Sequence, residues 1–514
     1  MKLSSSKLLL VLTGAFIFNL LFWNENIGVN AVIFDAFVCT GVFVLYPSCR
    51  NNKACRWLLA AQTITLAMII IQNTILSKVA FAVTLLLFVS FSEFAHQSVF
   101  FAGCSIITNY VAAIPNLFIE LGNISGNAVR ISGWIRRFRL LIIPLAILAV
   151  FFGIYASANI VFSNMLTAAA DTVVNWFSNI FYWFSFERII FFFLGIFIVA
   201  GILIKSNISW FSNKDMNCNN ELSRKKNRLK KWRETGFADL LQLIAGRAAT
   251  GNLALKNEYK MGTASIILLN LLLLVINVLD ISYVWLGYGI DKNTQLSAYV
   301  HEGTGLLILS IILAMLVLLF FFRGNINFYK QNKWLKYGAY FWILQNTFLV
   351  FSVFCRDYYY ISHLGLAYKR IGLLFFLLMV LAGLITILLK IYFKKTVYFL
   401  LRINGWVAIV LLIVSSSVNW DITIAKYNLQ HKATITPDVH FLLSLSDKAL
   451  PVLQKNEDVF QNASTGKTNY YFNNEYHNPL DYLKYRKEQF FVKEKQYSWL
   501  SWNLADANAL KELK

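Results

Sequence analysis

The sequence predicts an all-α protein: a polytopic transmembrane helix bundle with 11 crossings, or 12, and a small C-terminal α-helical module outside the membrane. Hydrophobic residues make up 58% of the chain and charged residues 14%, against about 25% charged residues in ordinary soluble domains. Mean hydropathy is +0.56. Apolar runs of 17 to 24 residues recur between short polar turns, and about 20 apolar residues suffice for one helix to cross a bilayer.

The net charge of +21 is spread unevenly along the chain. Residues 418–514 contain 12 Lys/Arg and 11 Asp/Glu, which leaves 35 and 15 for residues 1–417. The excess of positive charge therefore lies among the membrane segments, where the positive-inside rule accounts for it. No nucleic-acid-binding fold or motif accompanies the charge, so we expect the lipid bilayer as a partner and no nucleic acid.

The six cysteines show no disulfide or metal-binding pattern. Cys49 and Cys55 are separated by five residues, and no second pair matches them as a zinc site would require. The sequence also lacks an HExxH helix, a Walker-type loop, a Rossmann glycine fingerprint and a GxSxG elbow. We therefore expect no metal, no cofactor and no catalytic residue. An intramembrane transferase with dispersed acids and arginines is the enzyme class that stays open.

The N-terminal region predicts three helices before the first ambiguous segment. Two lysines precede the apolar run from Leu8 to Trp23, as in a signal peptide, but no small-residue cleavage site follows, so we expect an uncleaved first helix. Further helices are expected over Gly28–Tyr46 and Trp57–Leu76. The loop between them is basic, which places this loop and the N-terminus in the cytoplasm. Its basic residues are Arg50, Lys53 and Arg56.

The apolar segment from Val79 to Pro115 has two interpretations. Glu93 and His96 interrupt it, so it forms either two crossings or one crossing followed by an interfacial or re-entrant helix. The next loop is rich in arginine and is expected in the cytoplasm. Only a single crossing permits this if the N-terminus is also inside, so we favour 11 crossings over 12.

Two more helices, over Leu140–Phe162 and Ile189–Ile204, are expected to flank an aromatic segment, NWFSNIFYWF, at the outer interface. The segment from Lys205 to Lys260 contains 12 Lys/Arg and five acids. We expect this loop to fix the topology near anionic headgroups, and a docking surface for a cytoplasmic partner is the alternative.

The second half of the chain predicts five helices, and three successive basic loops place one side of them in the cytoplasm. The first helix, which follows Lys260, carries a polar stripe. Asn270, Asn277 and Asp280 are separated by steps of seven and three residues, so they share one helical face. Polar groups are costly in lipid, so this face is expected to point into the bundle. Asp35, near the middle of the second helix, is expected to be neutral or paired.

The candidate substrate- or ion-binding residues lie on this stripe or at the outer ends of neighbouring helices, where they would line a polar vestibule. The alternative role for Arg356 with Asp357 is an ion pair that fixes a loop. His301 and His363 could bind a metal ion only with a third ligand, and their spacing indicates none, so no metal site is expected. The candidates are Asn270, Asn277, Asp280, His301, Glu302, Arg356, Asp357 and His363.

Residues 418–514 have balanced charge and apolar positions at helical spacing, which favours a folded helical module over a disordered tail. The stretch NYYFNNEYHNP inside it is expected to be a loop. The expected division of the chain is N-terminal transmembrane helices over 1–204, a basic cytoplasmic loop over 205–261, C-terminal transmembrane helices over 262–417 and an extracytoplasmic helical tail over 418–514.

The chain resembles an uncharacterised bacterial, Bacteroidetes-like family of multi-pass membrane proteins, a domain of unknown function of the DUF4173/DUF4153 type. The resemblance extends from Leu21 to about Ala507. It implies a bacterial inner (cytoplasmic) membrane location, and it implies no activity, cofactor or catalytic residue. The segments that carry it are LFWNENIGVNAVIFD, VINVLDISYVW, AYVHEGTGLLILSIILA, RDYYYISHLGLAYKRIG, VNWDITIAKYNL and SWLSWNLADA.

Two functions from different classes follow. The folded tail and the lack of catalytic motifs favour a scaffold or envelope-assembly factor that presents residues 418–514 to a periplasmic protein partner. The polar stripe around Asp280 favours a transporter or flippase for a lipid-like or small polar substrate, although the sequence shows no inverted repeat and no paired broken helices. In both cases the N-terminus is expected in the cytoplasm and the C-terminus in the periplasm.

Overall fold

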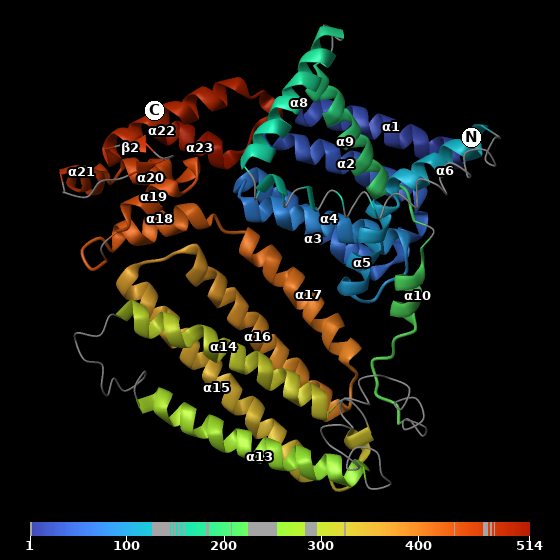
Figure 1. The fold of residues 1–514 in the computed structure, drawn as a ribbon, viewed down its shortest axis with the longest axis vertical. Helices are drawn as coiled ribbons and strands as arrows, with labels where there is room; N and C mark the ends of the chain where they lie inside the picture. Colours follow the sequence, from blue (N-terminus) through green and yellow to red (C-terminus); the bar gives the residue numbers. More distant parts are fainter. Residues whose placement is uncertain are drawn as a thin grey trace. The chain divides into compact units, whose positions relative to one another are not determined.

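A computed structural model shows that the described residues are almost entirely helical, as predicted (Figure 1). It divides into two compact units, residues 1–216 with 488–512 and 514, and residues 217–487 with 513. The structure describes residues 3–125, 144, 148, 151–152, 155–157, 160–180, 185–206, 208–224, 254–282, 296–322, 325–435, 437–465, 471–472, 475–476 and 478–514.

The first unit consists of helices from the start of the chain and of two short helices from its end. Its described elements are α1 (Leu3–Phe22), α2 (Val29–Leu45), η1 (Pro47–Asn51), α3 (Lys53–Ile71), α4 (Ile75–Glu93), α5 (Val99–Val111), α6 (Ala113–Ser125), α8 (Ile160–Ile180), α9 (Phe186–Leu203), α10 (Trp210–Met216), η6 (Trp499–Ser501) and α23 (Leu504–Leu513).

Small residues and side-chain caps explain where these helices begin and how closely they pack. Asn52 and Thr74 accept hydrogen bonds from the first turns of α3 and α4, so each helix begins directly after a capping residue. α1 packs on α9. A Cβ atom at Gly195 of α9 would lie 2.9 Å from the Phe18 ring and 3.3 Å from the Ala15 carbonyl oxygen, so only glycine permits this approach.

α5 and α6 form a pair that is bent by 57°. The start of α5 is held by Asp215, which accepts from the backbone N–H of Ser98 at 3.2 Å. The end of α5 is held by Ser206, whose N–H donates to Asn109 Oδ1 at 3.1 Å. Ser206 follows α9 directly, whereas Asp215 lies in α10, so the segment after α9 contacts both ends of α5. The bend fits either a broken span or a re-entrant pair, so the number of crossings in this segment stays a prediction.

The second unit contains the longest helices and most of the C-terminal segment. Its described elements are α13 (Ala254–Asp280), α14 (Leu296–Phe321), η4 (Asn325–Phe328), α15 (Lys333–Leu364), α16 (Tyr368–Phe393), α17 (Val397–Ser416), α18 (Trp420–Gln430), α19 (Val439–Ser444), η5 (Asp447–Ala449), α20 (Leu450–Gln454), α21 (Glu457–Thr465), β1 (Tyr471–Phe472) and β2 (Glu475–Tyr476). α22 (Pro479–Gln496) begins in this unit and ends in the first one.

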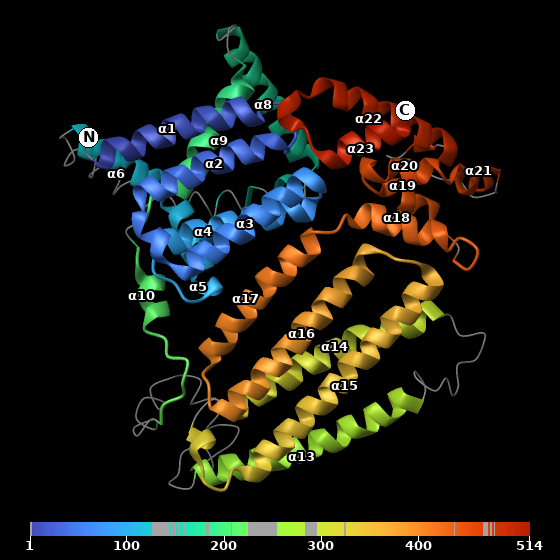
Figure 2. The same cartoon turned by 180° about the vertical axis from the view of Figure 1, so that it is seen from behind.

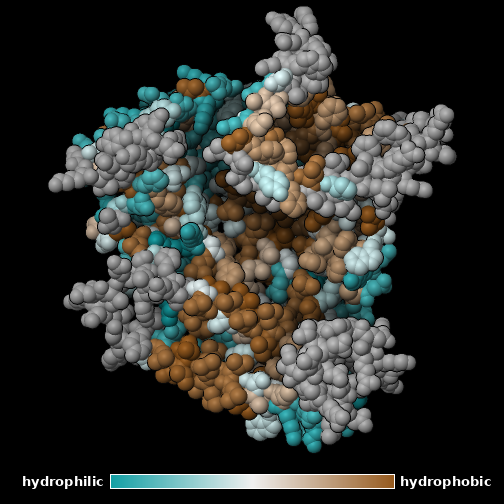
Figure 3. All heavy atoms as spheres, viewed as in Figure 1, coloured by the Kyte–Doolittle hydropathy of each residue, from teal (hydrophilic) through white to brown (hydrophobic). Residues whose placement is uncertain are grey.

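α15 is the central helix of the second unit, since it packs against α13, α14 and α16 (Figures 1 and 2). Ile266, Ile311, Leu349 and Leu384, one from each of these four helices, are at most 1% exposed. The outward faces are also apolar, and Figure 3 shows them as brown surface. A helix that is apolar on its exposed face is typical of a membrane span.

Eight helices of the described residues are long and apolar enough to cross a membrane, or nine if α5 and α6 form one span. They support a multi-pass membrane protein. α2 and the segment Gly305–Phe321 of α14 are apolar but shorter. The helix predicted over Leu140–Phe162 lies largely outside the described residues, as do residues 225–253 of the basic loop. The count of 11 or 12 crossings therefore stays a prediction.

The C-terminal segment is helical, but it does not lie within one unit. Residues 488–512 belong to the first unit and residues 418–487 to the second. The stretch expected to be a loop contains an antiparallel pairing of β1 with β2, in which Tyr471 lies opposite Tyr476. The expected limits of the four domains stay predictions.

Candidate functional site

The polar stripe of α13 is buried, as predicted. Asn270, Asn277 and Asp280 are each 8% exposed, whereas Leu271 and Val278 on the same helix are 56% and 54% exposed. The polar face of α13 therefore points into the unit and its apolar face points outward, as expected for a helix in a bilayer.

α15 supplies partners for this stripe at intervals of seven residues. Asn270 Nδ2 donates to the Gly338 carbonyl oxygen at 3.0 Å, and Gln345 Nε2 donates to Asn270 Oδ1 at 2.7 Å. Asn277 Nδ2 donates to the Gln345 carbonyl oxygen at 3.3 Å. Residues seven apart lie on one helical face, so two matching stripes meet along the length of both helices.

Asp280 has a counter-charge at the end of this contact. Arg356 Nη2 lies 2.5 Å from Asp280 Oδ1, and Ser352 Oγ donates to Asp280 Oδ2 at 2.7 Å. The Arg356 and Asp280 side chains are 10% and 11% exposed, so little water screens the pair. We call this set the α13–α15 seam: Asn270, Asn277, Asp280, Gln345, Ser352 and Arg356.

The other predicted residues are not all part of the seam. Asp357 is 4% exposed, and its Oδ2 is buried without a hydrogen-bond partner among the described residues. His363 is exposed, and its Nδ1 lies 2.9 Å from the Tyr359 carbonyl oxygen of the same helix. The side chains of His301 and Glu302 lie outside the described residues. In the described part of the chain, no group of three His, Cys, Asp or Glu side chains is arranged to hold a metal ion.

The first unit contains a buried acid that was not among the predicted site residues. Asp35, on α2, is 6% exposed, and its Oδ1 accepts a hydrogen bond from Gln62 Nε2 of α3. Cys39 Sγ lies 3.9 Å from Asp35 Oδ2 and 3.5 Å from Gln62 Nε2. The spacing of Asp35 and Cys39, one turn apart, was visible in the sequence. The position of Gln62 opposite them was not, because it depends on how α2 and α3 pack.

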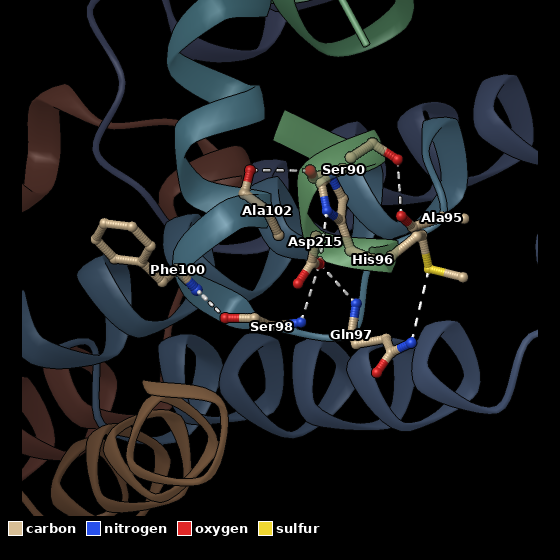
Figure 4. A network of polar contacts seen from close by, with 10 residues as sticks. Ser90, Ala95, His96, Gln97, Ser98, Phe100, Ala102 and Asp215 are labelled. Carbon is tan, nitrogen blue, oxygen red and sulfur yellow. Dashed lines mark hydrogen bonds and ion pairs between the residues drawn. The ribbon is translucent and has the colours of Figure 1, made fainter. Parts of the chain in front are cut away.

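A second polar cluster of this unit holds α10 against the loop between α4 and α5 (Figure 4). Asp215 Oδ2 lies 3.0 Å from His96 Nδ1 and accepts from the Gln97 N–H at 2.8 Å. Ser212 Oγ donates to the Ala95 carbonyl oxygen at 2.8 Å. The side chains of His96 and Asp215 are fully buried. A carboxylate only accepts hydrogen bonds, so His96 Nδ1 carries a proton and donates it to Asp215.

Glu93 lies beside this cluster at the end of α4. Asn109 Nδ2 donates to Glu93 Oε2, and Lys205 Nζ donates to the Glu93 carbonyl oxygen at 2.5 Å. Lys205 Nζ also lies 4.3 Å from the centre of the Phe94 ring. These contacts tie α4, α5 and the segment after α9 together, so the cluster has a structural role at this end of the unit.

At the other end of the first unit, the C-terminal segment closes over the turn between α1 and α2. Glu25 accepts from the Ser498 N–H at 3.2 Å, the Asn26 N–H donates to Ser501 Oγ at 2.7 Å, and the Val29 N–H donates to the Trp502 carbonyl oxygen at 3.2 Å. A Cβ atom at position 28 would lie 2.5 Å from the Ser501 carbonyl oxygen, so the turn requires glycine. We call these contacts the C-terminal clasp: Glu25, Asn26, Gly28, Val29, Ser498, Ser501 and Trp502.

Comparison with protein families shows that residues 37–456 match the model of Domain of unknown function (DUF4153). Comparison with curated proteins and with solved structures gives no match. The matched range includes Gln62, the partner of Asp35, and the whole α13–α15 seam. Both segments of the C-terminal clasp, residues 25–29 and 498–502, lie outside it.

Proposed function

This chain belongs to the DUF4153 family, a domain of unknown function, and we propose from its own geometry that it is a non-enzymatic membrane scaffold or envelope-assembly factor. In this proposal the helices hold a folded C-terminal segment at the outer surface of a bacterial inner membrane, where a periplasmic protein binds it. The C-terminal clasp carries the proposal, because it holds the last part of the chain in a defined place through hydrogen bonds from three backbone N–H groups.

The part of the C-terminal segment that lies in the second unit is also well ordered. Leu442, Leu453 and Phe460 are each 0% exposed, so the short helices share a core. Arg486 of α22 donates to the carbonyl oxygens of Leu443 at 2.7 Å and of Leu445 at 2.8 Å. A segment with a buried core and such side-chain contacts suits a binding surface better than a disordered tail.

The distribution of charge supports the proposed orientation. The end of the first unit that contains the N-terminus carries six lysine and arginine residues at or near helix ends, whereas Lys78 and Arg188 stand at the opposite helix ends, beside the C-terminal clasp. Under the positive-inside rule the N-terminus is then cytoplasmic and the clasp is periplasmic. The basic residues are Lys7, Arg50, Lys53, Arg56, Lys205 and Lys214.

Two exposed apolar residues on α22 are suitable probes for a partner. Tyr485 and Val492 are each 50% exposed on a helix that is otherwise rich in charge. A photo-crosslinking amino acid is placed at each position in the full chain, in cells. The matched control is Trp334, which is 76% exposed at the start of α15 and is expected on the cytoplasmic side.

The proposal predicts one protein adduct of discrete mass from positions 485 and 492 and not from position 334. Adducts with lipid only, or the same adducts from all three positions, would contradict the scaffold role. An alkaline phosphatase fused after Lys514 is predicted to be active, and an inactive fusion would reverse the proposed orientation.

A transporter or flippase for a lipid-like or small polar substrate is the second candidate. The observation that favours it is buried charge on the apolar helices, because ionisable residues in a membrane are costly and are common in transport pathways. Lys390, in the last turn of α16, is 1% exposed and donates to the Phe322 carbonyl oxygen at 2.7 Å. The α13–α15 seam favours a packing role instead, since its side chains bond one another across the two helices.

A further inference from the structure

Asp35 occupies the middle of an apolar helix. It is the seventh of the 17 residues of α2, and its partner Gln62 is the tenth of the 19 residues of α3. Each helix rises about 1.5 Å per residue, so Asp35 lies about 9 Å and Gln62 about 13 Å from the nearer end of its helix. A carboxyl group at this depth cannot reach the headgroup region, because the aspartate side chain is short.

The described groups that form hydrogen bonds with Asp35 are neutral. Gln62 supplies an amide N–H, and Cys39 supplies a thiol at 3.9 Å. α2 packs against α1, α3, α4, α9, η1 and η6, and the charged residues of these elements stand near their ends. Together with the thiols near them, the charged and titratable groups of these elements are Lys7, Cys49, Arg50, Lys53, Cys55, Arg56, Lys78, Glu93, Glu187 and Arg188.

An ionised carboxylate in a membrane interior requires a compensating positive charge. Asp280 in the second unit meets this requirement with Arg356. For Asp35, the helices that pack against α2 provide no cation at the same depth among the described residues. The remaining way to balance the charge is a proton or a small cation that binds to the carboxylate itself.

The side-chain oxygen of Gln62, which is an unsatisfied hydrogen-bond acceptor, decides whether a proton or a small cation binds to Asp35. Gln62 is 0% exposed, and its Oε1 is buried without a hydrogen-bond partner in the described residues. An ionised carboxylate can only accept and leaves this oxygen unpaired, whereas a carboxylic acid can donate O–H to an amide oxygen. The amide then donates N–H to one carboxyl oxygen and accepts O–H from the other. Only the protonated form of Asp35 satisfies both groups of Gln62.

Hydroxyl groups continue from this pair along α3. Thr65 Oγ1 donates to the Gln62 carbonyl oxygen at 3.0 Å and lies 3.1 Å from Thr84 Oγ1 of α4. Towards the start of α3, Ser92 Oγ lies 3.1 Å from Cys49 Sγ and 4.0 Å from Cys55 Sγ. Buried hydroxyls and thiols therefore lie on both sides of the pair within the same group of helices.

We propose that Asp35 and Gln62 form a proton-binding site inside the first unit. The ligand is a proton, which forms an O–H bond on the Asp35 carboxylate and a hydrogen bond to the Gln62 side-chain oxygen. This site is separate from the scaffold role and does not depend on it. Its residues are an acid, an amide and a neighbouring thiol, which is a set suited to a proton and poor in oxygen ligands for a metal cation.

The test is infrared spectroscopy of the full-length protein in lipid nanodiscs, in H₂O and D₂O. The proposal predicts a carboxylic-acid C=O band that shifts in D₂O and is lost in the isosteric variant Asp35→Asn. Glu93→Gln is the matched control, because it removes another buried carboxyl group of the same unit, and it is predicted to keep the Asp35 band. Gln62→Met keeps the acid and is predicted to shift the band, since the amide partner is lost.

Two results would overturn the proposal. A spectrum of Asp35→Asn with every carboxylic-acid band of the original protein would show that Asp35 binds no proton. A band that disappears when Na⁺ is added at constant pH would show that the site binds a metal cation instead. If Asp35→Asn does not fold, the shift predicted for Gln62→Met still decides the matter, and an unshifted band contradicts the proposal.

Discussion

Asp35 and Asp280 are both acids on apolar helices, both are less than 10% exposed, and each contacts a neighbouring helix that carries a glutamine. They differ in what surrounds them. Asp280 lies at the end of α13 and meets Arg356, whereas Asp35 lies in the middle of α2 and meets the uncharged Gln62. The comparison shows that burial alone does not define a functional acid, because an acid with a counter-charge can serve packing only.

Arg356→Ala is expected to cause the largest loss in the free energy of unfolding. This change leaves Asp280 buried without its counter-charge, which costs about 3–5 kcal/mol for a buried pair. The measurement is the free energy of unfolding in detergent micelles. The control is the double variant Asp280→Asn with Arg356→Gln, which removes both charges and keeps hydrogen-bonding groups, and which is expected to recover most of the loss. Equal losses in the two proteins would show that the ion pair is not what stabilises the seam.

A smaller loss of stability is expected at Gly338, where α15 packs directly against α13. A Cβ atom at Gly338 would lie 2.8 Å from Ile266 Cγ2, and Ile266 is 1% exposed in the core. Gly338→Ala is therefore expected to destabilise the protein by about 1–3 kcal/mol. Gly372→Ala on α16 is the control, because nothing lies within 4 Å of its Cβ position. The measurement is the unfolding temperature of the two variants. Equal unfolding temperatures for Gly338→Ala and Gly372→Ala would contradict the close contact between Gly338 and Ile266.

The smallest effect is expected from an exposed ion pair in the C-terminal segment. The hydrogen bond from Lys432 holds the pKa of Asp458 below its ordinary value. The charged form is favoured in the folded protein, so the pair stabilises it above the ordinary aspartate pKa, and this contribution is lost as the pH falls through the lowered pKa. Lys432→Met is expected to return the pKa of Asp458 towards its ordinary value, measured by NMR titration, with no resolvable change in melting temperature at neutral pH.

This pair sharpens the contrast with Arg356 and Asp280. The Lys432 and Asp458 side chains are 40% and 56% exposed, so water screens their interaction. A loss of stability in Lys432→Met as large as that in Arg356→Ala would show that burial does not set the strength of these pairs.

The sequence predicts the class of this fold well because membrane helices are long apolar runs with basic loops. It also predicts that Asn270, Asn277 and Asp280 share a buried face, since helical periodicity is a local property. The residues of α15 that form the other side of the seam were harder to predict. Gly338, Gln345 and Ser352 repeat every seven residues along α15, but nothing local indicates which helix they face.

Contacts between distant parts of the chain were not predictable from the sequence. The clasp joins Glu25 to Ser498, and no local pattern pairs these residues. Gln62 was missed for the same reason, because a single amide in an apolar helix has no periodic signal. The predicted vestibule of outer residues also depended on packing, and the structure joins only part of that set in the seam.

The most direct test of the comparison is the free energy of unfolding of Asp35→Asn and Asp280→Asn, measured in the same detergent and at the same pH. Asp280→Asn leaves Arg356 charged and unpaired, and it is expected to lose about 3–5 kcal/mol. Asp35→Asn keeps an amide-compatible partner for Gln62 and creates no unpaired charge, so it is expected to lose about 1 kcal/mol or less. Equal losses, or a larger loss in Asp35→Asn, would contradict the conclusion that the two acids are balanced in different ways.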